Sequence, residues 1–202
     1  MNDLKLLQEA YAKICEGSED IPQEVQDYIV NNKRGNLNLD SLLYPGPISL
    51  PDNLTVRGSL YLRNSLIKAL PKNLRIEGDL NLSGADITTL PSDIKVGGFI
   101  ELGQSKIETL PDNLTVNSSL SVAGTKIKKL PKGLKVKYSL FLYGLPIERV
   151  EDLPADLEVQ GRIESRYFTD KEAKTYLARI KQLNKKLSDT FSKEDLEALE
   201  DF

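Results

Sequence analysis

A phrase of twenty residues is repeated five times without a slip in the middle of the chain. The first copy reads LPDNLTVRGSLYLRNSLIKA, and the five copies begin at Leu50, Leu70, Leu90, Leu110 and Leu130. All five follow the pattern L-P-x-x-[LI]-x-[VI]-x-x-x-[LI]-x-[LV]-x-x-x-x-I-x-x. A fixed period of this length is typical of a repeat protein, in which each repeat forms one structural unit that stacks on the next.

Apolar residues alternate with polar ones in two short runs of each copy, as in Leu54-x-Val56 and Leu60-x-Leu62. This is the period of a β-strand with one buried face, and each run is too short for a helix. A glycine stands between the two runs of the first three copies, where a residue that tolerates positive φ suits a bend. We therefore predict a repeat solenoid, mainly β, with short parallel strands and a core formed by positions 54, 56, 60 and 67 and their equivalents at twenty-residue intervals.

Irregular repeats continue the regular ones at both ends. Leu37 precedes Leu60 by 23 residues, and Ile163 follows Leu140 by 23 residues, with the extra residues in the turn at Tyr44 and near Val150. Irregular terminal repeats are expected where a regular stack meets a cap. The sequence thus predicts a helical N-terminal cap over residues 1–35, a solenoid of about seven coils over 36–165, and a helical C-terminal cap over 166–202.

The run L-x-L-x-x-S-x-I-x-x-L-P, from Leu60 to Pro71, resembles the leucine-rich repeat with its consensus LxxLxLxxNxLxxLP. Two departures favour a tighter and more sheet-rich solenoid than the horseshoe of that family. The leading leucine of the consensus falls on polar positions such as Arg57, and the ladder asparagine is replaced by Ser65, Ala85, Ser105, Thr125 and Leu145. The phrase also resembles that of uncharacterised repeat proteins of tailed bacteriophages and bacteria.

Helical patterns flank the solenoid. Two helices are predicted before it, over residues 3–15 and from Pro22 to just before Gly35. After it, Thr169 and Glu172 form a capping box at the start of an amphipathic helix. One interpretation is that this helix folds onto the last coil as a cap, and the other is that its apolar stripe also forms a homodimer seam. The stripe consists of Tyr176, Ile180, Leu183, Leu187 and Phe191.

Catalysis is not indicated by the residue types. The chain has no histidine, so neither a Ser/His/Asp nor a Cys/His arrangement can be built, and the commonest ligand of transition metals is missing. The single cysteine, Cys15, lies inside a helical pattern and is interpreted as a packing residue. The Gly97-Gly98 pair lacks the Lys-Ser/Thr of a P-loop, so no phosphate site is predicted. We predict no enzyme, no metal and no cofactor.

Recognition is the better-supported activity. The residues beside the leucines of each L-x-L run point outward, and they vary from coil to coil while the core positions do not. Aromatic residues flanked by charge are typical of binding hot spots. The alternative is that the C-terminal helices cover these rings. The predicted partner-binding residues are Tyr61, Arg63, Asn81, Glu101, Tyr138, Phe141 and Tyr143.

Lysines gather in the fourth and fifth copies although the net charge of the chain is −3. Exposed lysines protect sheet edges from aggregation, which is one explanation, and an acidic partner is another. Nucleic acid is not favoured, because no arginines are interleaved with these lysines and a platform for stacking single-stranded bases is missing. The predicted basic patch consists of Lys126, Lys128, Lys129, Lys132, Lys135 and Lys137.

These observations predict a non-enzymatic interaction protein that binds another macromolecule, preferably a protein, through the outward strand face. The bacteriophage resemblance implies an inhibitor of a host defence protein. Alternatives are a protein that sequesters a small ligand or nucleotide, or an enzyme accessory subunit. No membrane segment or secretory signal is expected, and the single cysteine fits a reducing cytoplasm, which would be that of the host cell for a phage-encoded protein.

Deleting one whole repeat, residues 90–109, is expected to leave a folded but shorter protein, because each coil mainly contacts its neighbours. Deleting only residues 90–99 is expected to unfold the chain, since the core positions no longer stack. Circular dichroism and thermal melting of the two deletion variants compare these outcomes. Equal loss of structure in both would contradict the one-dimensional architecture.

Overall fold

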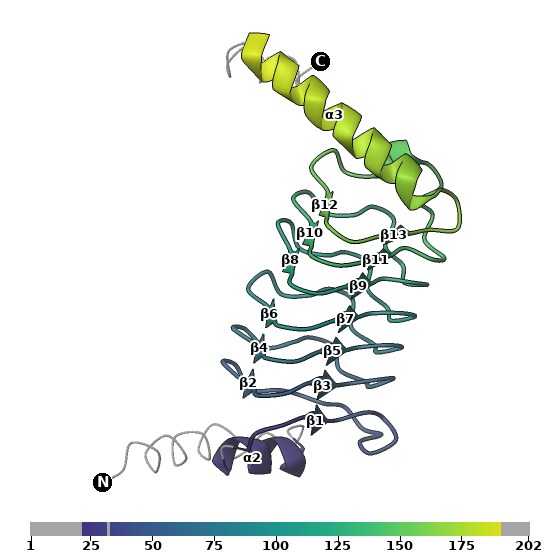
Figure 1. Ribbon diagram of the computed structural model, residues 1–202. Helices are drawn as coiled ribbons and strands as arrows, with labels where there is room; N and C mark the ends of the chain where they lie inside the picture. The colour runs from purple at the N-terminus through teal and green to yellow at the C-terminus, as the bar shows by residue number, and fades with distance from the viewer. Residues whose placement is uncertain (1–21, 32, 191–202) are drawn as a thin grey trace.

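The computed structural model describes residues 22–31 and 33–190. It is a parallel β-solenoid with a helix at each end, as Figure 1 shows. The L-x-L runs form one parallel sheet of seven strands, whose order follows the chain and whose strands delimit six turns of the solenoid, against the predicted number of about seven. The strands are β1 (Leu37–Asn38), β3 (Leu60–Tyr61), β5 (Leu80–Asn81), β7 (Ile100–Glu101), β9 (Leu120–Ser121), β11 (Leu140–Phe141) and β13 (Ile163–Glu164).

The other run of each repeat lies in one of two smaller parallel sheets of three strands each. The first small sheet consists of β2 (Thr55–Val56), β4 (Arg75–Ile76) and β6 (Lys95–Val96). The second consists of β8 (Thr115–Val116), β10 (Lys135–Val136) and β12 (Glu158–Val159). Strand β6 is not hydrogen-bonded to β8, so this side of the solenoid is interrupted in the middle while the seven-stranded sheet is continuous.

The predicted strand register and core are confirmed. Leu60 pairs with Leu80 across twenty residues, and Leu37 pairs with Leu60 across the irregular step of 23. The predicted core positions are at most 9 % exposed throughout the five copies. Stacking therefore joins the short apolar rows of all the coils into a single continuous core.

The glycines between the two runs have a different role from the predicted one. Positive φ occurs elsewhere, for example at Asn53 (φ 63°) in the proline turn, and not at Gly58, Gly78 or Gly98. A Cβ built on Gly78 would lie 2.8 Å from the carbonyl carbon of Gly58 and 2.9 Å from its oxygen. These glycines are thus required by the close approach of successive coils.

Side chains add a second set of bonds between coils. The aspartates of the proline turns, which typically cap their own turn, instead accept hydrogen bonds from the neighbouring coil. Asp52 accepts from the N–H of Lys72 at 2.8 Å, and Asp93 accepts from the N–H of Asn73 at 2.7 Å. On another side of the stack, Lys106 and Lys68 both contact the carboxylate of Asp86, and their hydrogen bonds lower its pKa to about 2.

Helix α2 (Gln23–Val30) confirms the predicted second N-terminal helix. Its Val25 is fully buried, and the Tyr28 hydroxyl donates to the carbonyl of Gly35 at 2.8 Å. The same hydroxyl accepts from the N–H of Arg57 at 2.9 Å. The other predicted N-terminal helix, residues 3–15, lies outside the described residues.

The extra residues of the last irregular repeat form the 3₁₀ helix η1 (Val150–Asp152), and helix α3 (Asp170–Thr190) then covers the last coil with its first turns. The predicted capping box is present, because Thr169 donates its N–H to Glu172 at 2.7 Å and Glu172 donates its N–H to the Thr169 hydroxyl at 3.3 Å. Asp170 accepts from the N–H of Ile163 at 2.9 Å and so closes the open edge of the large sheet. Tyr176 and Leu177 pack against the core, and the C-terminal part of α3 extends away from the solenoid (Figure 1).

The Gly78→Ala substitution is expected to lower the free energy of unfolding by about 1–3 kcal/mol, because the new methyl group overlaps the backbone of the preceding coil. Gly46→Ala is the matched control, since no atom lies within 4 Å of a Cβ at that position. Chemical denaturation of both variants measures the difference. Equal stability of the two would mean that the coils do not stack as closely as described.

Candidate functional site

The outward face of the seven-stranded sheet brings together most of the predicted partner-binding residues. The strand register places Tyr61, Asn81, Glu101 and Phe141 in one row with Ser121 and Glu164. We call this set of six side chains the outward row. Equivalent positions on adjacent strands are about 4.8 Å apart, so the row forms a nearly linear array on a rigid support.

Polar members of the outward row are held by hydrogen bonds to their own strands. Asn81 accepts from the N–H of Ser83 at 3.0 Å, and Glu101 accepts from the N–H of Gly103 at 2.7 Å. Their side chains are partly buried. A partner would therefore meet fixed polar groups, and little side-chain entropy would be lost when it binds.

Arg63 lies beside the outward row, and its position is determined by a buried acid. Its Nε donates to Asp40 at 2.8 Å, its N–H donates to the same carboxylate at 2.6 Å, and the carboxyl is only 4 % exposed. A buried carboxylate requires such a partner, so this pair is part of the structure of the first coils. The guanidinium remains about half exposed and can contact a partner from this fixed position.

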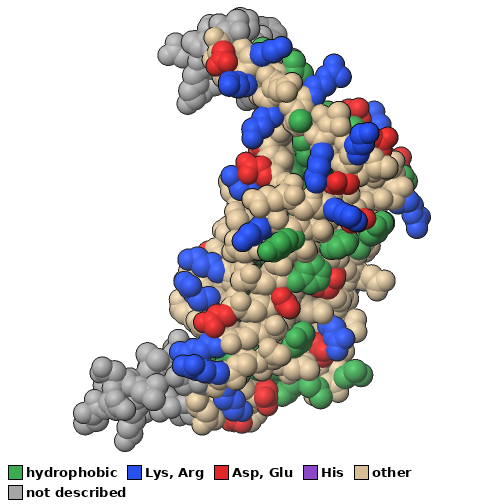
Figure 2. All heavy atoms as spheres, in the orientation of Figure 1, with side chains coloured by type: hydrophobic (Ala, Val, Ile, Leu, Met, Phe, Trp, Pro, Cys, Tyr) green, Lys and Arg blue, Asp and Glu red, His purple; other side chains and the backbone are tan. Residues whose placement is uncertain are grey.

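Aromatic side chains gather at the C-terminal end of the same face. Tyr143 is 44 % exposed and Phe141 is half-buried, while Tyr138, on the turn between β10 and β11, is 55 % exposed. Figure 2 shows hydrophobic side chains over β7, β9 and β11. Helix α3 packs on η1 and β13 and leaves Tyr143 and Tyr138 exposed.

Polar contacts fix two of these rings. The Tyr143 hydroxyl donates to Glu164 at 2.9 Å, and this hydrogen bond raises the pKa of the phenol. The ammonium group of Lys137 lies 5.9 Å from the centre of the Tyr138 ring, within the range of a cation–π interaction. Tyr167, 48 % exposed, adds aromatic surface near the last coil that the sequence analysis did not select, because it follows the last repeat.

The predicted basic patch is distributed around the coils. Lys126 follows β9 and lies 3.9 Å from Glu108, whereas Lys135 belongs to β10 on another side and lies 3.4 Å from Glu158. Lys128 and Lys129 follow Lys126, and Lys132 is in the proline turn before β10. These twelve positions run from the segment after β9, through the proline turn, to β10, so the six lysines do not share one face.

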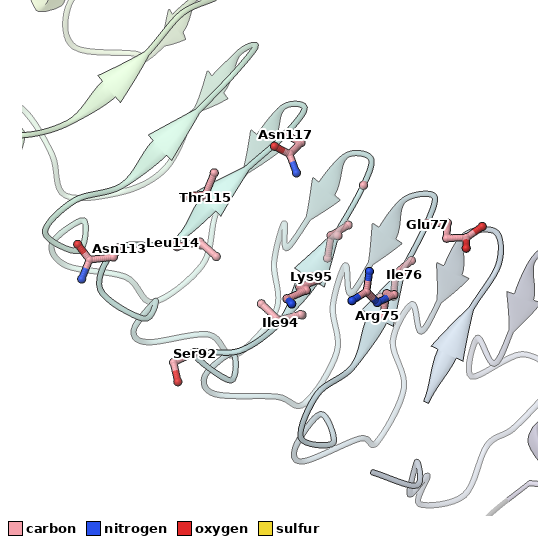
Figure 3. A pocket seen from close by; sticks show the side chains of 12 residues that line it. Arg75, Ile76, Glu77, Ser92, Ile94, Lys95, Asn113, Leu114, Thr115 and Asn117 are labelled. Carbon is pink, nitrogen blue, oxygen red and sulfur yellow. The ribbon is translucent and has the colours of Figure 1, made fainter. Parts of the chain in front are cut away.

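A groove lies on the interrupted side of the solenoid, where the sequence analysis placed no site. It encloses about 490 Å³ and is lined by residues of β4, β6 and β8 and of their flanking turns (Figure 3). The only sequence signal for it is the irregular segment Gly97-Gly98-Phe99 of the third copy. By itself, the Gly97-Gly98 pair indicates neither a phosphate site nor an opening between coils.

Two other features, metal clusters and membrane-spanning helices, are absent from the described part of the chain. Within residues 22–31 and 33–190, no group of three acidic, histidine or cysteine side chains is arranged to hold a metal ion. No helix in these ranges is long and apolar enough to cross a bilayer. Cys15 and Phe191 lie outside these ranges.

Comparisons of the chain with protein-family models, with curated proteins and with solved structures gave no match. The class of the protein therefore follows from its own architecture, which is a capped parallel β-solenoid with two exposed surfaces of different character. One is the continuous face that carries the outward row, and the other is the groove on the interrupted side.

Proposed function

We propose that this protein is a non-enzymatic interaction module that binds another protein through the outward face of its seven-stranded sheet. The observation that carries the proposal is an aromatic group beside a rigid polar row, in which Tyr143 and Tyr138 are exposed and Phe141 is half-buried. Tyrosine supplies a large contact area with few rotatable bonds, which is why it is enriched in binding hot spots.

The support of this surface favours binding without rearrangement. The outward row rests on backbone hydrogen bonds of 2.8–3.1 Å between successive coils, such as those from Leu142 to Glu164 and from Val122 to Phe141. A pre-organised surface loses little conformational entropy on association. The type of side chain in the outward row changes from coil to coil, from Tyr61 through Glu101 to Phe141. A partner with complementary groups at the same spacing would therefore be preferred over other proteins.

The biological role that fits this surface is inhibition or sequestration of a host protein by a phage-encoded protein in the host cytoplasm. This part of the proposal rests on the resemblance of the repeated phrase to phage and bacterial repeat proteins. A binding surface without catalytic groups can inhibit a partner simply by covering its active site or its own interaction surface.

Helix α3 provides the basis for a second proposal, that two copies associate through it. Leu183 and Leu187 are 45 % and 43 % exposed on the part of the helix that leaves the solenoid. An antiparallel pair of helices from two copies would cover both leucines and remove their apolar surface from water.

The Phe141→Ala and Tyr143→Ala substitutions are each expected to weaken partner binding by more than about 1 kcal/mol, with little change in melting temperature. The measurement is a pull-down from bacterial lysate followed by titration of the recovered protein. Leu66→Ala is the control, because Leu66 is 40 % exposed but lies outside the outward row. Failure to recover a stoichiometric partner under several conditions would contradict the proposal. A loss of about 3 kcal/mol in the free energy of unfolding of either aromatic variant would also contradict it, because losses of that size are typical of core residues.

Replacing both Leu183 and Leu187 with aspartate is expected to convert a dimer into a monomer without lowering the melting temperature, since both side chains are exposed in the single chain. Light scattering coupled to size-exclusion chromatography gives the mass of the wild type and of the variant. A wild-type protein that stays monomeric at its highest attainable concentration would rule out the helix-mediated dimer.

A further inference from the structure

The backbone ladder of the two small sheets stops between β6 and β8. Strand β6 is joined to β4 by hydrogen bonds from Lys95 to the carbonyl of Leu74 at 3.1 Å and from Gly97 to the carbonyl of Ile76 at 2.9 Å. The equivalent bonds of the next junction, from Thr115 to Ile94 and from Asn117 to Val96, are not formed. Among the described residues, these four backbone groups have no other hydrogen-bond partner.

The same two coils remain joined on their other sides. On the large sheet, Ile100 donates its N–H to the carbonyl of Ser119 at 3.0 Å, and Leu102 donates to Ser121 at 2.9 Å. On the remaining side, Lys126 donates to Ile107 at 2.9 Å. The coils therefore separate like a wedge, closed at β7–β9 and open at β6–β8 (Figure 1).

Two devices that join other coils are absent at this junction. The N–H of Gly98 donates to the Gly78 carbonyl at 2.8 Å and the N–H of Tyr138 donates to the Ser118 carbonyl at 3.0 Å, but the equivalent bond from Ser118 to the Gly98 carbonyl is missing. A side-chain ladder is also interrupted at Phe99. Asp79 accepts from the N–H of Phe99 at 2.7 Å and Ser119 accepts from Ser139 at 3.0 Å, but Phe99 itself offers no acceptor to Ser119.

The opening produces a groove with a polar rim and an apolar base. Ile94, Val96 and Leu114, which line it, belong to the core rows and are 5–9 % exposed. Arg75 and Lys95 project beside it from β4 and β6 (Figure 3). Neither cation has an ion-pair partner in the described part of the chain.

We propose that this groove is a strand-pairing site that accepts an extended acidic peptide segment of a partner protein between β6 and β8. The backbone of an extended segment presents N–H and C=O groups on both of its sides. It can thus bond to Ile94 and Val96 on one side and to Thr115 and Asn117 on the other. The groove lies on a different face from the outward row. A negative result for peptide binding in the groove would therefore leave the proposed function of the outward face untouched, and the reverse also holds.

The chemistry of the rim and base specifies the side chains of the segment. Successive residues of a strand point to opposite faces, so every second side chain would enter the apolar base near Val96 and Leu114. The intervening side chains would lie in the row of Arg75 and Lys95, where carboxylates neutralise the unpaired cations. The expected ligand therefore alternates β-branched and acidic residues.

The test uses a fluorescently labelled octapeptide of alternating valine and glutamate, with binding measured by fluorescence anisotropy. Two control peptides carry the same label, one with lysine in place of glutamate and one N-methylated at alternate residues so that one row of backbone donors is removed. Each control is expected to bind about tenfold more weakly or worse. Absence of binding by the first peptide, or equal binding by the N-methylated one, overturns the proposal.

Two variants of the protein locate the bound peptide. Phe99→Ser supplies the missing side-chain acceptor for the N–H of Ser119 and is expected to close the groove and abolish binding. Arg75→Glu combined with Lys95→Glu is expected to weaken binding at least about tenfold and to reverse the preference toward the lysine peptide. Unchanged binding by either folded variant contradicts the assignment.

Hydrogen exchange provides a readout that does not depend on the variants. The amides of Thr115 and Asn117 are expected to exchange rapidly in the free protein and to become protected when the valine–glutamate peptide is added. The amides of Lys135 and Lys137, which already donate to Leu114 and Val116, serve as internal controls. Protection elsewhere, without protection of Thr115 and Asn117, would place the peptide at another site and refute the strand-pairing mode.

Discussion

The fold depends on backbone hydrogen bonding between coils that are in register. Each strand contains only two ladder residues, and such a short strand has no stability of its own. Stacking supplies bonds such as that from Leu60 to Asp79 at 2.8 Å and, at the same time, aligns the apolar rows into one core. This coupling explains why the five regular copies tolerate no insertion and why the two steps of 23 residues occur only next to the helical ends.

The same coupling determines how the protein presents its surface. Outward positions such as Tyr61 and Phe141 can vary because the backbone ladder, and not their side chains, fixes the coils. The result is a rigid array whose composition changes along the stack, which suits recognition of another protein. Among the described residues, α2 and the first turns of α3 pack on the two ends of the solenoid, whereas its outward sheet face and its groove stay open to a partner, as does the C-terminal part of α3.

A local failure of stacking gives the groove its chemistry. Where Phe99 interrupts the side-chain ladder and Ser118 makes no backbone bond to Gly98, Thr115 and Asn117 keep unused donors, while the hydrogen bonds of the large sheet hold the solenoid together. An unpaired strand edge in water is a liability for aggregation unless it is short or protected by charge. Here the edge is two residues long, and Arg75 and Lys95 flank it. An acidic extended segment can therefore pair with this edge, whereas pairing with unrelated strands is limited by the short length and the positive charge.

The sequence by itself determined the strand register, the core rows and the alignment of Tyr61 with Phe141, because these follow from the twenty-residue period. It also determined the capping box at Thr169, which follows from a local motif. It did not reveal that Asp40 needs Arg63, that Gly78 is required by a neighbouring coil, or that β6 and β8 separate. Each of these depends on distances between residues about twenty positions apart, and only stacking of the coils fixes those distances. A strictly regular pattern predicts identical junctions, so the tertiary structure alone decided which junction opens.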